Sequence, residues 1–334
     1  MSKITGRGYD VLAMGRSSID LYANEIGAPF TEVKTFSAYV GGSPTNIIVG
    51  SRRLGLRAAL LTAVGEDLVG DFVLDFLARE GVEAGFSPRK AGRRTSAFML
   101  AIQPPDKFPI VPYRDNCADL ELTVEDVRRA PVAESRALLL TGSGLSREPS
   151  RAATRAAAET ARAHGGKVVL DLDVRAELWP DPRAYAAEVR ALLPLVNVVI
   201  GTAEEVGAAL ELERAVADLS APVGAELRAG IASLLGAGPE ALVVKRGARS
   251  TLVFTRGGGS VEAETFPVEV LNVLGAGDAF AGGFLYGYLK GWDWRRAARM
   301  GNACGAIVVT RHGCANFMPY EHEALAFIEQ RGGF

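Results

Sequence analysis

The chain has 334 residues, of which 48% are hydrophobic, and its formal net charge is −2. This length and hydrophobic content are enough to bury one large core. The near-zero charge argues against nucleic acid and against an anionic membrane surface as partners, so the expected ligand is a small molecule.

Strand-like and helix-like segments alternate along most of the chain. Strands are expected where a short segment is continuously apolar or rich in β-branched residues, at residues 58–64, 137–140, 167–172, 196–200 and 241–245. Helices are expected between them, most ending near a glycine, at residues 44–54, 69–80, 151–164, 184–193, 203–212 and 225–235. The alternation predicts an α/β layered fold with a mostly parallel central sheet.

Three local patterns predict how particular elements begin or turn. Ser43 before Pro44 is typical of a helix cap followed by a first-turn proline. Thr202 and Glu205 have the spacing of a capping box. The three glycines at 257–259 predict a hairpin turn.

Two stretches, residues 17–40 and 95–114, interrupt the alternation with alternating or aromatic-rich runs that lack a helical period. We expect them to form antiparallel strands of a small lid across the sheet edge, able to close over a substrate. An ordinary extension of the sheet edge is the alternative. The simplest division is one unit, residues 1–334, with a lid assembled from these two separated stretches.

A loop of small residues opens an apolar helix near the C-terminal end, where residues 272–284 read NVLGAGDAFAGGF. Gly275 and Gly277 let the backbone approach a ligand closely, and the first helical turn offers N–H groups that suit an anion. Asp278 beside a phosphate would repel it unless its task is to take a proton from an attacking hydroxyl. The segment therefore indicates phosphoryl transfer, and a first-turn acid on a buried helix is the alternative.

A second glycine-rich element, GGSPTN, occupies residues 41–46 and starts the predicted helix at residues 44–54. Its paired glycines permit backbone contact with hydroxyl groups, and Asn46 can donate and accept hydrogen bonds at once. Taken alone, the element is equally typical of a tight turn.

Together, the two elements resemble the signatures of the ribokinase-like (PfkB) carbohydrate kinases, in the family's order and spacing, and the resemblance runs from about Tyr9 to Pro319. It implies a ribokinase-like three-layer α/β/α sandwich with a small β-sheet lid. Two further runs, MGRSSIDLYANE from Met14 and YRDNCADL from Tyr113, are most similar to the subgroup that phosphorylates 5-dehydro-2-deoxygluconate in inositol catabolism.

The resemblance implies transfer of the γ-phosphoryl group of ATP to the terminal hydroxyl of a sugar acid. Asp278 would be the catalytic base, with the N–H groups of Gly275, Ala276 and Gly277 stabilising charge on the transferring group. The positions at which the family binds sugar hydroxyls are Asp20, Gly41, Gly42 and Asn46.

Arginines are expected to bind the carboxylate of a sugar acid, because a guanidinium group matches it with two parallel hydrogen bonds. Arg114 ends one lid stretch, and Arg175 lies in the run DLDVRAELW. That run resembles the Asp-x-Asn-x-Arg-x-x-Leu-Trp pattern of kinases acting on keto-deoxy sugar acids, with Asp173 in place of the asparagine. Arg16 is a third candidate, for which a solvated surface charge is the alternative.

The nucleotide and metal sites are expected from the resemblance alone. Lys245 and Gly247 resemble the family's turn near ATP. Gly275 and Gly277 of the loop just before Asp278, called the anion loop below, are expected to contact the nucleotide as well. Asn302 lies in a run that resembles the family's adenine-side helix. Magnesium is expected with the nucleotide, and Glu204 keeps the carboxylate of the family's Asn-x-x-Glu run, in which Gly201 replaces the amide. A potassium ion is a further family-level expectation that these side chains do not specify.

Several alternatives remain open from the sequence. A kinase for 2-keto-3-deoxygluconate or fructose would use the same phosphate machinery, and a non-catalytic sugar or nucleotide sensor could keep the same fold. A nicotinamide dehydrogenase is disfavoured because residues 14–18, after the first strand, lack the G-x-G-x-x-G spacing. No Walker-type G-x-x-x-x-G-K-[ST] motif occurs either. A homodimer through the lid strands is a family-level expectation.

The three cysteines and the N-terminal residues bear on cellular location. Cys117, Cys304 and Cys314 are an odd number without CxxC spacing, which argues against a disulfide framework and a structural zinc site. Residues 1–10 contain no apolar run of signal-peptide length, and no stretch of about 18 apolar residues occurs. The sequence therefore predicts a cytoplasmic protein without a membrane span.

Overall fold

The fold is organised around one large sheet in a computed structural model that describes residues 8–104, 107–212 and 225–334. The strands of this sheet are β1 (Tyr9–Met14), β4 (Ala58–Leu61), β9 (Ser135–Thr141), β10 (Lys167–Asp171), β11 (Val198–Thr202), β12 (Ala241–Lys245), β13 (Thr251–Thr255) and β14 (Ser260–Ala263). Their order is β14-β13-β12-β11-β10-β9-β1-β4, and the strands from β12 to β4 run parallel. β13 and β14 add an antiparallel hairpin at one edge.

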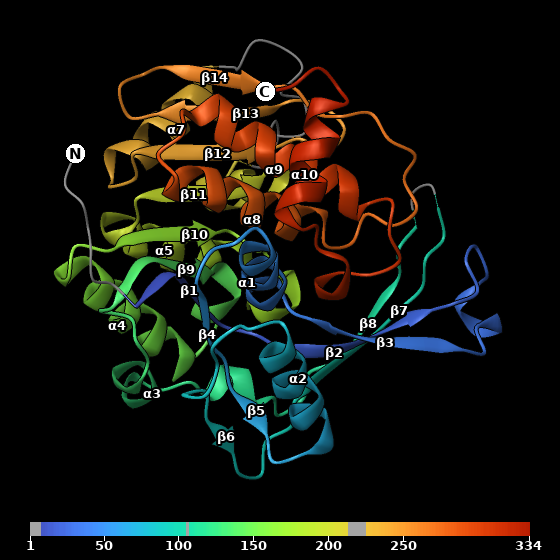
Figure 1. Ribbon diagram of the computed structural model, residues 1–334. Helices are drawn as coiled ribbons and strands as arrows, with labels where there is room; N and C mark the ends of the chain where they lie inside the picture. Colours follow the sequence, from blue (N-terminus) through green and yellow to red (C-terminus); the bar gives the residue numbers. More distant parts are fainter. Residues whose placement is uncertain (1–7, 105–106, 213–224) are drawn as a thin grey trace.

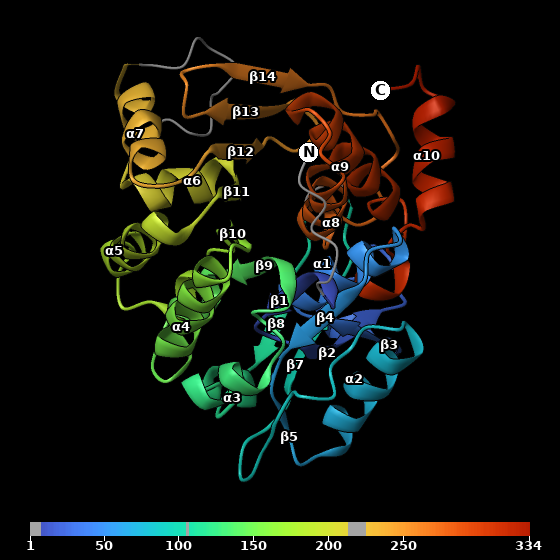
Figure 2. The ribbon, with the colours of Figure 1, turned by 60° about the vertical axis from the view of Figure 1, so that its left-hand side comes forward.

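Helices cover both faces of the large sheet (Figures 1 and 2). One face carries α1 (Ser43–Arg53), α2 (Leu68–Arg79), α8 (Ala276–Leu289), α9 (Trp294–Val308) and α10 (Glu321–Glu329). The other carries α3 (Val124–Arg129), α4 (Ser150–Ala163), α5 (Pro182–Leu192), α6 (Ala203–Leu210) and α7 (Ala225–Gly236). Successive side chains of β1 alternate between the two hydrophobic cores, with Val11 and Ala13 in one and Leu12 and Met14 in the other. The predicted three-layer α/β/α sandwich is confirmed.

A small sheet projects from the large one (Figure 1). Its strands are β2 (Ser18–Ala23), β3 (Phe36–Gly41), β7 (Ser96–Leu100) and β8 (Ile110–Tyr113), in the order β3-β2-β7-β8. β2 pairs with β3, and β7 with β8, in antiparallel fashion, but the central pair β2–β7 is parallel. The expectation of antiparallel strands throughout is therefore wrong for the central pair, because its two members come from separate stretches rather than from one hairpin. Residues 105–106, within the second stretch, lie outside the described residues.

Most predicted element boundaries lie within a few residues of those observed. The strand expected at residues 58–64 is divided, since Val64–Gly65 forms a separate strand, β5, that pairs with β6 (Arg89–Lys90). The capping box of α6 and the hairpin turn between β13 and β14 are confirmed. Ser43 is the first residue of α1 rather than its cap. The cap is Gly42, whose φ is +100° and whose added Cβ would lie 2.4 Å from the Arg16 carbonyl oxygen, so this position needs glycine.

The carboxyl ends of the parallel strands meet at one edge of the large sheet. β10, β11 and β12 end there at Asp171, Thr202 and Lys245, close to the first turn of α8. Ligands of open parallel sheets bind outside this edge. Within the described ranges, no helix is long and apolar enough to span a membrane.

Candidate functional site

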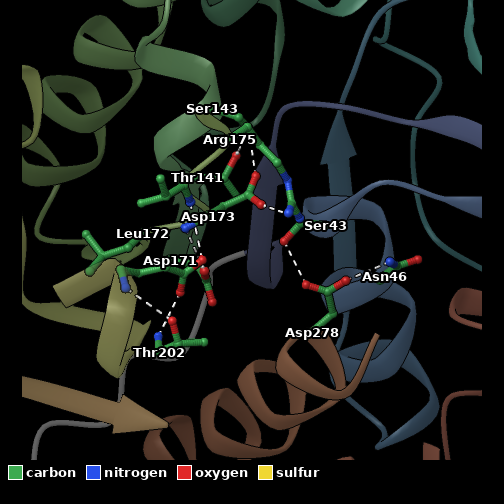
Figure 3. A network of polar contacts seen from close by, with 12 residues as sticks. Ser43, Asn46, Thr141, Ser143, Asp171, Leu172, Asp173, Arg175, Thr202 and Asp278 are labelled. Carbon is green, nitrogen blue, oxygen red and sulfur yellow. Dashed lines mark hydrogen bonds and ion pairs between the residues drawn. The ribbon is translucent and has the colours of Figure 1, made fainter. Parts of the chain in front are cut away.

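Asp278 is held by two side chains from another helix (Figure 3). Ser43 Oγ donates to Asp278 Oδ1 at 2.8 Å, and Asn46 Nδ2 donates to Asp278 Oδ2 at 2.7 Å. Ser43 and Asn46 are three residues apart on α1, so they lie on the same face of that helix. The start of α8 and the start of α1, distant in sequence, therefore form one polar centre.

Burial raises the pKa of Asp278, while the hydrogen bonds from Asn46 and Ser43 oppose that rise. Asp173 raises the pKa further and Lys245 lowers it. A carboxylate with a raised pKa and two donors is oriented and more basic than a solvated aspartate, as a general base requires.

The loop before Asp278 presents backbone N–H groups at a helix start. Gly275 is the left-handed cap of α8, with φ +83°, and an added Cβ would lie 2.8 Å from Cys314 Sγ. The Ala276 N–H donates to the Val273 carbonyl at 3.3 Å, so it is less available than expected. The N–H groups of Gly275, Gly277 and Asp278 have no acceptor among the described residues. The N–H groups free to bind an anion are thus those of Gly275, Gly277 and Asp278 rather than the expected set with Ala276.

Asp20 packs directly against the paired glycines. An added Cβ on Gly41 would lie 1.8 Å from Asp20 Oδ2, so glycine at this position makes room for the carboxylate. Ser18 Oγ donates to Asp20 Oδ1 at 2.7 Å, and burial raises the pKa of Asp20 to about 6. The two glycines therefore shape the site around Asp20 and the Arg16 carbonyl.

The structure brings the three candidate arginines into one region. Arg16 and Arg114 are each 8% exposed, and the Arg16 guanidinium lies over the Phe98 ring at 5.0 Å. Arg114 is ion-paired with Asp119, a partner that the sequence did not indicate. Arg175 is ion-paired with Asp173 at 2.8 Å and is more open, with 41% of its side chain exposed. Arg16 is thus buried, contrary to the solvated alternative.

Among the candidate substrate-binding residues, three buried polar atoms have no hydrogen-bond partner in the described part of the chain: Arg16 Nε, Arg114 Nη1 and Asn46 Oδ1. An unsatisfied buried donor or acceptor destabilises a protein by about 1–3 kcal/mol. Such groups are expected where a polar ligand supplies the missing partner.

The residues expected to bind the nucleotide differ in whether the structure leaves them available for a ligand. Lys245 lies against the anion loop, since an added Cβ on Gly277 would be 3.2 Å from Lys245 Nζ. Gly247, with φ +61°, forms the open turn after β12. Asn302 is engaged elsewhere: its amide donates to the Ala263 and Glu264 carbonyls and accepts from Thr251. Both amide hydrogens of Asn302 hold α9 to the β13–β14 hairpin, so they are not available to a nucleotide.

The carboxylate that α6 turns towards the site is Glu205 rather than Glu204. Glu204 is exposed at the second position of the helix. Glu205 accepts hydrogen bonds from the Thr202 and Val174 N–H groups and contributes to the raised pKa of Lys245. The capping-box spacing that identifies Glu205 as the residue folding back was already visible in the sequence.

Sequence reasoning also missed two partners of site residues. Ser43 could have been found from its three-residue spacing to Asn46 on α1, which places both on one face. Asp171 has no such local signal, since it meets Lys245 across β11 (Figure 3 shows Asp171).

Comparison with known proteins gives a consistent result. Residues 9–321 match the family described as pfkB family carbohydrate kinase. A protein of Clostridium tetani named 5-dehydro-2-deoxygluconokinase is 32% identical over 323 residues, covering 96% of this chain and 93% of its own. A protein of Halalkalibacterium halodurans with the same name is 34% identical over 327 residues, covering 98% and 96%.

Solved structures with a similar fold include two fructokinases. The Xylella fastidiosa fructokinase with bound ATP has a TM-score of 0.83 and 27% identity, covering 96% of this chain and 98% of its own. A double mutant of the Vibrio cholerae fructokinase, bound to fructose, ADP and potassium, has a TM-score of 0.81 and 26% identity, covering 96% and 99%.

Proposed function

Because the chain belongs to the pfkB family of carbohydrate kinases and is a phosphotransferase, we propose that it phosphorylates the terminal C6 hydroxyl of 5-dehydro-2-deoxygluconate with ATP. The names of the relatives from Clostridium tetani and Halalkalibacterium halodurans support this substrate. Its place in inositol catabolism is implied by the sequence resemblance to the subgroup that acts on this sugar acid. The proposal includes ATP as phosphoryl donor, supported by the ATP in the Xylella fastidiosa fructokinase.

The observation that carries the sugar-acid proposal is the pair of unsatisfied buried nitrogens on Arg16 and Arg114. Arg114 already has Asp119 as a counter-ion, but Arg16 is in no ion pair within the described part of the chain. A substrate carboxylate would supply the missing acceptors and the missing negative charge. A neutral sugar could supply only hydroxyl oxygens, which are weaker partners for guanidinium groups.

In the proposed reaction, Asp278 accepts the proton of the C6 hydroxyl while that oxygen forms a bond to the γ-phosphorus. The bond from the γ-phosphorus to the bridging oxygen breaks, and ADP leaves. Ser43 and Asn46 keep the Asp278 carboxylate oriented towards the hydroxyl. The N–H groups of Gly275, Gly277 and Asp278 stabilise charge on the transferring group, and Asp20, Gly41, Gly42 and Asn46 surround the sugar.

The chain fits magnesium that arrives with the nucleotide rather than a site built by protein ligands. In the portion of the chain that is described, no group of three or more His, Cys, Asp or Glu residues is placed to hold a metal ion. Mg²⁺ typically keeps several waters and binds through substrate phosphates, whose charge it neutralises. Glu204 is exposed on α6, so the contact with magnesium proposed for it would be made through water.

We also propose that the enzyme depends on potassium and that the small sheet closes over the substrate. Potassium dependence is supported by the ion in the Vibrio cholerae fructokinase, and replacing K⁺ with tetramethylammonium in the assay tests it. Closure of the small sheet over the substrate is supported by the positions of Asp20 and of Phe98, which lie on that sheet and contact the site.

Substrate identity is tested by measuring ADP production with Mg-ATP across five acceptors: 5-dehydro-2-deoxygluconate, 2-keto-3-deoxygluconate, gluconate, fructose and ribose. The Asp278→Ala variant, which should retain ATP binding and lose turnover, serves as background. We expect the highest kcat/KM for the first acceptor. Preference for fructose or ribose would discard the sugar-acid proposal, and normal turnover by Asp278→Ala would discard Asp278 as the base.

The role of the buried arginines is tested separately with Arg16→Gln and Arg114→Gln. Each should raise KM for the preferred sugar acid by about 10- to 100-fold, since a hydrogen bond to a charged group contributes about 1.5–3 kcal/mol. The same variants should change KM for a poor neutral acceptor much less. Equal effects on acid and neutral acceptors would contradict carboxylate recognition by these two residues.

A further inference from the structure

The segment that follows β10 has an unusual backbone at the candidate site. Asp173 has φ +33°, a left-handed conformation that residues other than glycine rarely adopt. The side chain of Asp173 is 3% exposed and accepts a hydrogen bond from Ser143 Oγ at 2.8 Å. Strained backbone that the surrounding contacts hold in place is typical of functional sites.

Asp171, two residues earlier, accepts hydrogen bonds from both the Lys245 side chain and the Asp173 backbone. Its carboxylate is almost fully buried, and Oδ2 accepts from Lys245 Nζ at 3.1 Å. Oδ1 accepts from the Asp173 N–H at 3.1 Å, which helps to fix the strained residue. One carboxylate therefore positions Lys245 directly and Arg175 indirectly, through the Asp173–Arg175 ion pair.

Both cations approach the start of α8. The ammonium group of Lys245 lies against Gly277 of the anion loop. In Figure 3, the Arg175 side chain extends from Asp173 towards Ser43 and Asp278. The pKa of Arg175 is raised chiefly by Asp173, with a further contribution from Asp278, which is consistent with this direction. Arg114 instead has Asp119 as its ion-pair partner.

We propose that Lys245 and Arg175 form a two-cation cradle for the γ-phosphoryl group, and that Asp171 is the positioning residue that holds both cations. In this proposal Arg175 binds the phosphoryl donor and not the carboxylate of the sugar acid. Arg16 and Arg114 bind that carboxylate. The assignment rests on the proposed function only in requiring a nucleoside triphosphate as donor. During transfer, negative charge spreads over the peripheral oxygens of the phosphoryl group, where fixed cations stabilise it.

The cradle is tested by equilibrium binding without any acceptor, comparing ADP with the β,γ-imido analogue of ATP at constant Mg²⁺. Lys245→Met and Arg175→Gln should each weaken binding of the analogue by about 10- to 100-fold. Binding of ADP, which lacks the γ-phosphate, should change less than about threefold. The matched control is Arg114→Gln, which should leave the ratio of the two dissociation constants unchanged.

Two results would overturn the cradle. Equal weakening of ADP and analogue binding by Lys245→Met would place Lys245 on the inner phosphates. An unchanged ratio in Arg175→Gln, with a raised KM for the sugar acid, would return Arg175 to carboxylate recognition. Because this binding assay contains no sugar, it still reports on the cradle if the acceptor proves to be a neutral sugar.

The role of Asp171 is tested by the pH dependence of the same ratio. Lys245 on β12 faces carboxylates from three elements, namely Asp171 on β10, Glu205 on α6 and Asp278 on α8. Burial disfavours the charged ammonium, but Asp171 and then the other two carboxylates raise the pKa of Lys245 overall. Removing the Asp171 charge should therefore lower the pKa of Lys245 and make binding of the analogue decline as pH rises.

Asp171→Asn keeps an acceptor for the Asp173 N–H, so we expect it to fold, which thermal unfolding checks. Between pH 7 and pH 10, the binding ratio should be nearly constant in the wild type and should fall in Asp171→Asn. The double variant Asp171→Asn with Lys245→Arg should restore a constant ratio, because arginine stays protonated throughout this range. A constant ratio in the single variant would show that Asp171 does not control the charge of Lys245.

Discussion

At the scale of single residues, the orientation of Asp278, the proposed catalytic base, depends on its two hydrogen-bond donors. Ser43 and Asn46 each donate to a different oxygen of Asp278, so both oxygens are oriented before any substrate binds. These donors also favour the ionised carboxylate against the effect of burial, which raises its pKa. These donors therefore help Asp278 to stay ionised, as its proposed role as a base requires.

Removing one donor should alter the pH profile of the enzyme. In Ser43→Ala the pKa of Asp278 should rise further, because the hydrogen bond to the ionised form is lost. The acid limb of kcat against pH should move to higher pH, with kcat at the acid end falling about 3- to 10-fold. Ser51→Ala is the matched control, since Ser51 is on the same helix and its buried hydroxyl has no partner among the described residues. An unchanged acid limb in Ser43→Ala would contradict the role of this hydrogen bond.

Asp20 should make the stability of the fold depend on pH. Burial raises the pKa of Asp20 to about 6 in the folded protein, against about 3.9 in an unfolded chain. Between these values the folded state binds more protons than the unfolded state, so the Asp20 contribution to stability is lost as pH rises from about 4 to about 6. Relative to the wild type, Asp20→Asn should gain up to about 3 kcal/mol of unfolding free energy across this window.

The measurement is urea unfolding of both proteins at pH 4, 5, 6 and 7, and the quantity of interest is the difference between them. Asparagine can still accept the hydrogen bond from Ser18, so the local packing is preserved. A difference that does not vary with pH would show that Asp20 is not the titrating group.

At the scale of elements, the position of Asp278 depends on how closely α8 and α9 approach each other. An added Cβ on Gly283 would lie 2.8 Å from Cys304 Sγ and 2.8 Å from the Met300 carbonyl oxygen, both on α9. The glycine is required by this contact, because backbone of the neighbouring helix cannot move away without separating the two helices.

Gly283→Ala should therefore destabilise the protein by about 1–3 kcal/mol, as expected for overpacking. The control is Gly236→Ala at the end of α7, where an added Cβ meets nothing within 4 Å. That substitution should be neutral or slightly stabilising, because alanine favours the helix. Thermal unfolding of the two variants beside the wild type measures the effect, and equal melting temperatures would contradict it.

The segment after α9 links the small sheet to the anion loop. His312 Nε2 contacts the Ala23 carbonyl at 3.0 Å, and Asn316 Oδ1 accepts from the Val40 N–H at 3.0 Å. Asn272, just before the anion loop, donates to the His312 carbonyl at 3.2 Å. The strands β2 and β3 of the small sheet and the loop before α8 are therefore connected through one short segment.

At the scale of the whole molecule, the outer edge of the small sheet offers a surface for a second copy of the chain. β8 is an edge strand whose residues Ile110, Val111 and Tyr113 are exposed by 44%, 37% and 58%. Exposed apolar edge strands tend to pair with other strands. We therefore keep the proposal of a homodimer through the small sheet.

A charge on this edge should oppose the dimer. We expect Val111→Lys to convert a dimer into a monomer, as measured by size-exclusion chromatography with light scattering. Leu68→Lys is the control, because Leu68 is also exposed, at 84%, but lies on α2 rather than on the small sheet. A monomeric wild type, or a Val111→Lys variant that remains dimeric, would contradict the proposal.

The local patterns of the sequence determined the layered α/β architecture, the capping box of α6, the hairpin turn and the two glycine-rich elements, because these depend on residues a few positions apart. The pairing of β2 with β7, the placement of Ser43 and Asn46 beside Asp278, and the burial of Arg16 were decided only by the tertiary structure. The same holds for Asp171 and Lys245, which are 74 positions apart and meet because β10, β11 and β12 end at one edge of the sheet. Sequence spacing identifies which groups can do chemistry, whereas the crossing of separate strands and helices decides which of them share a site.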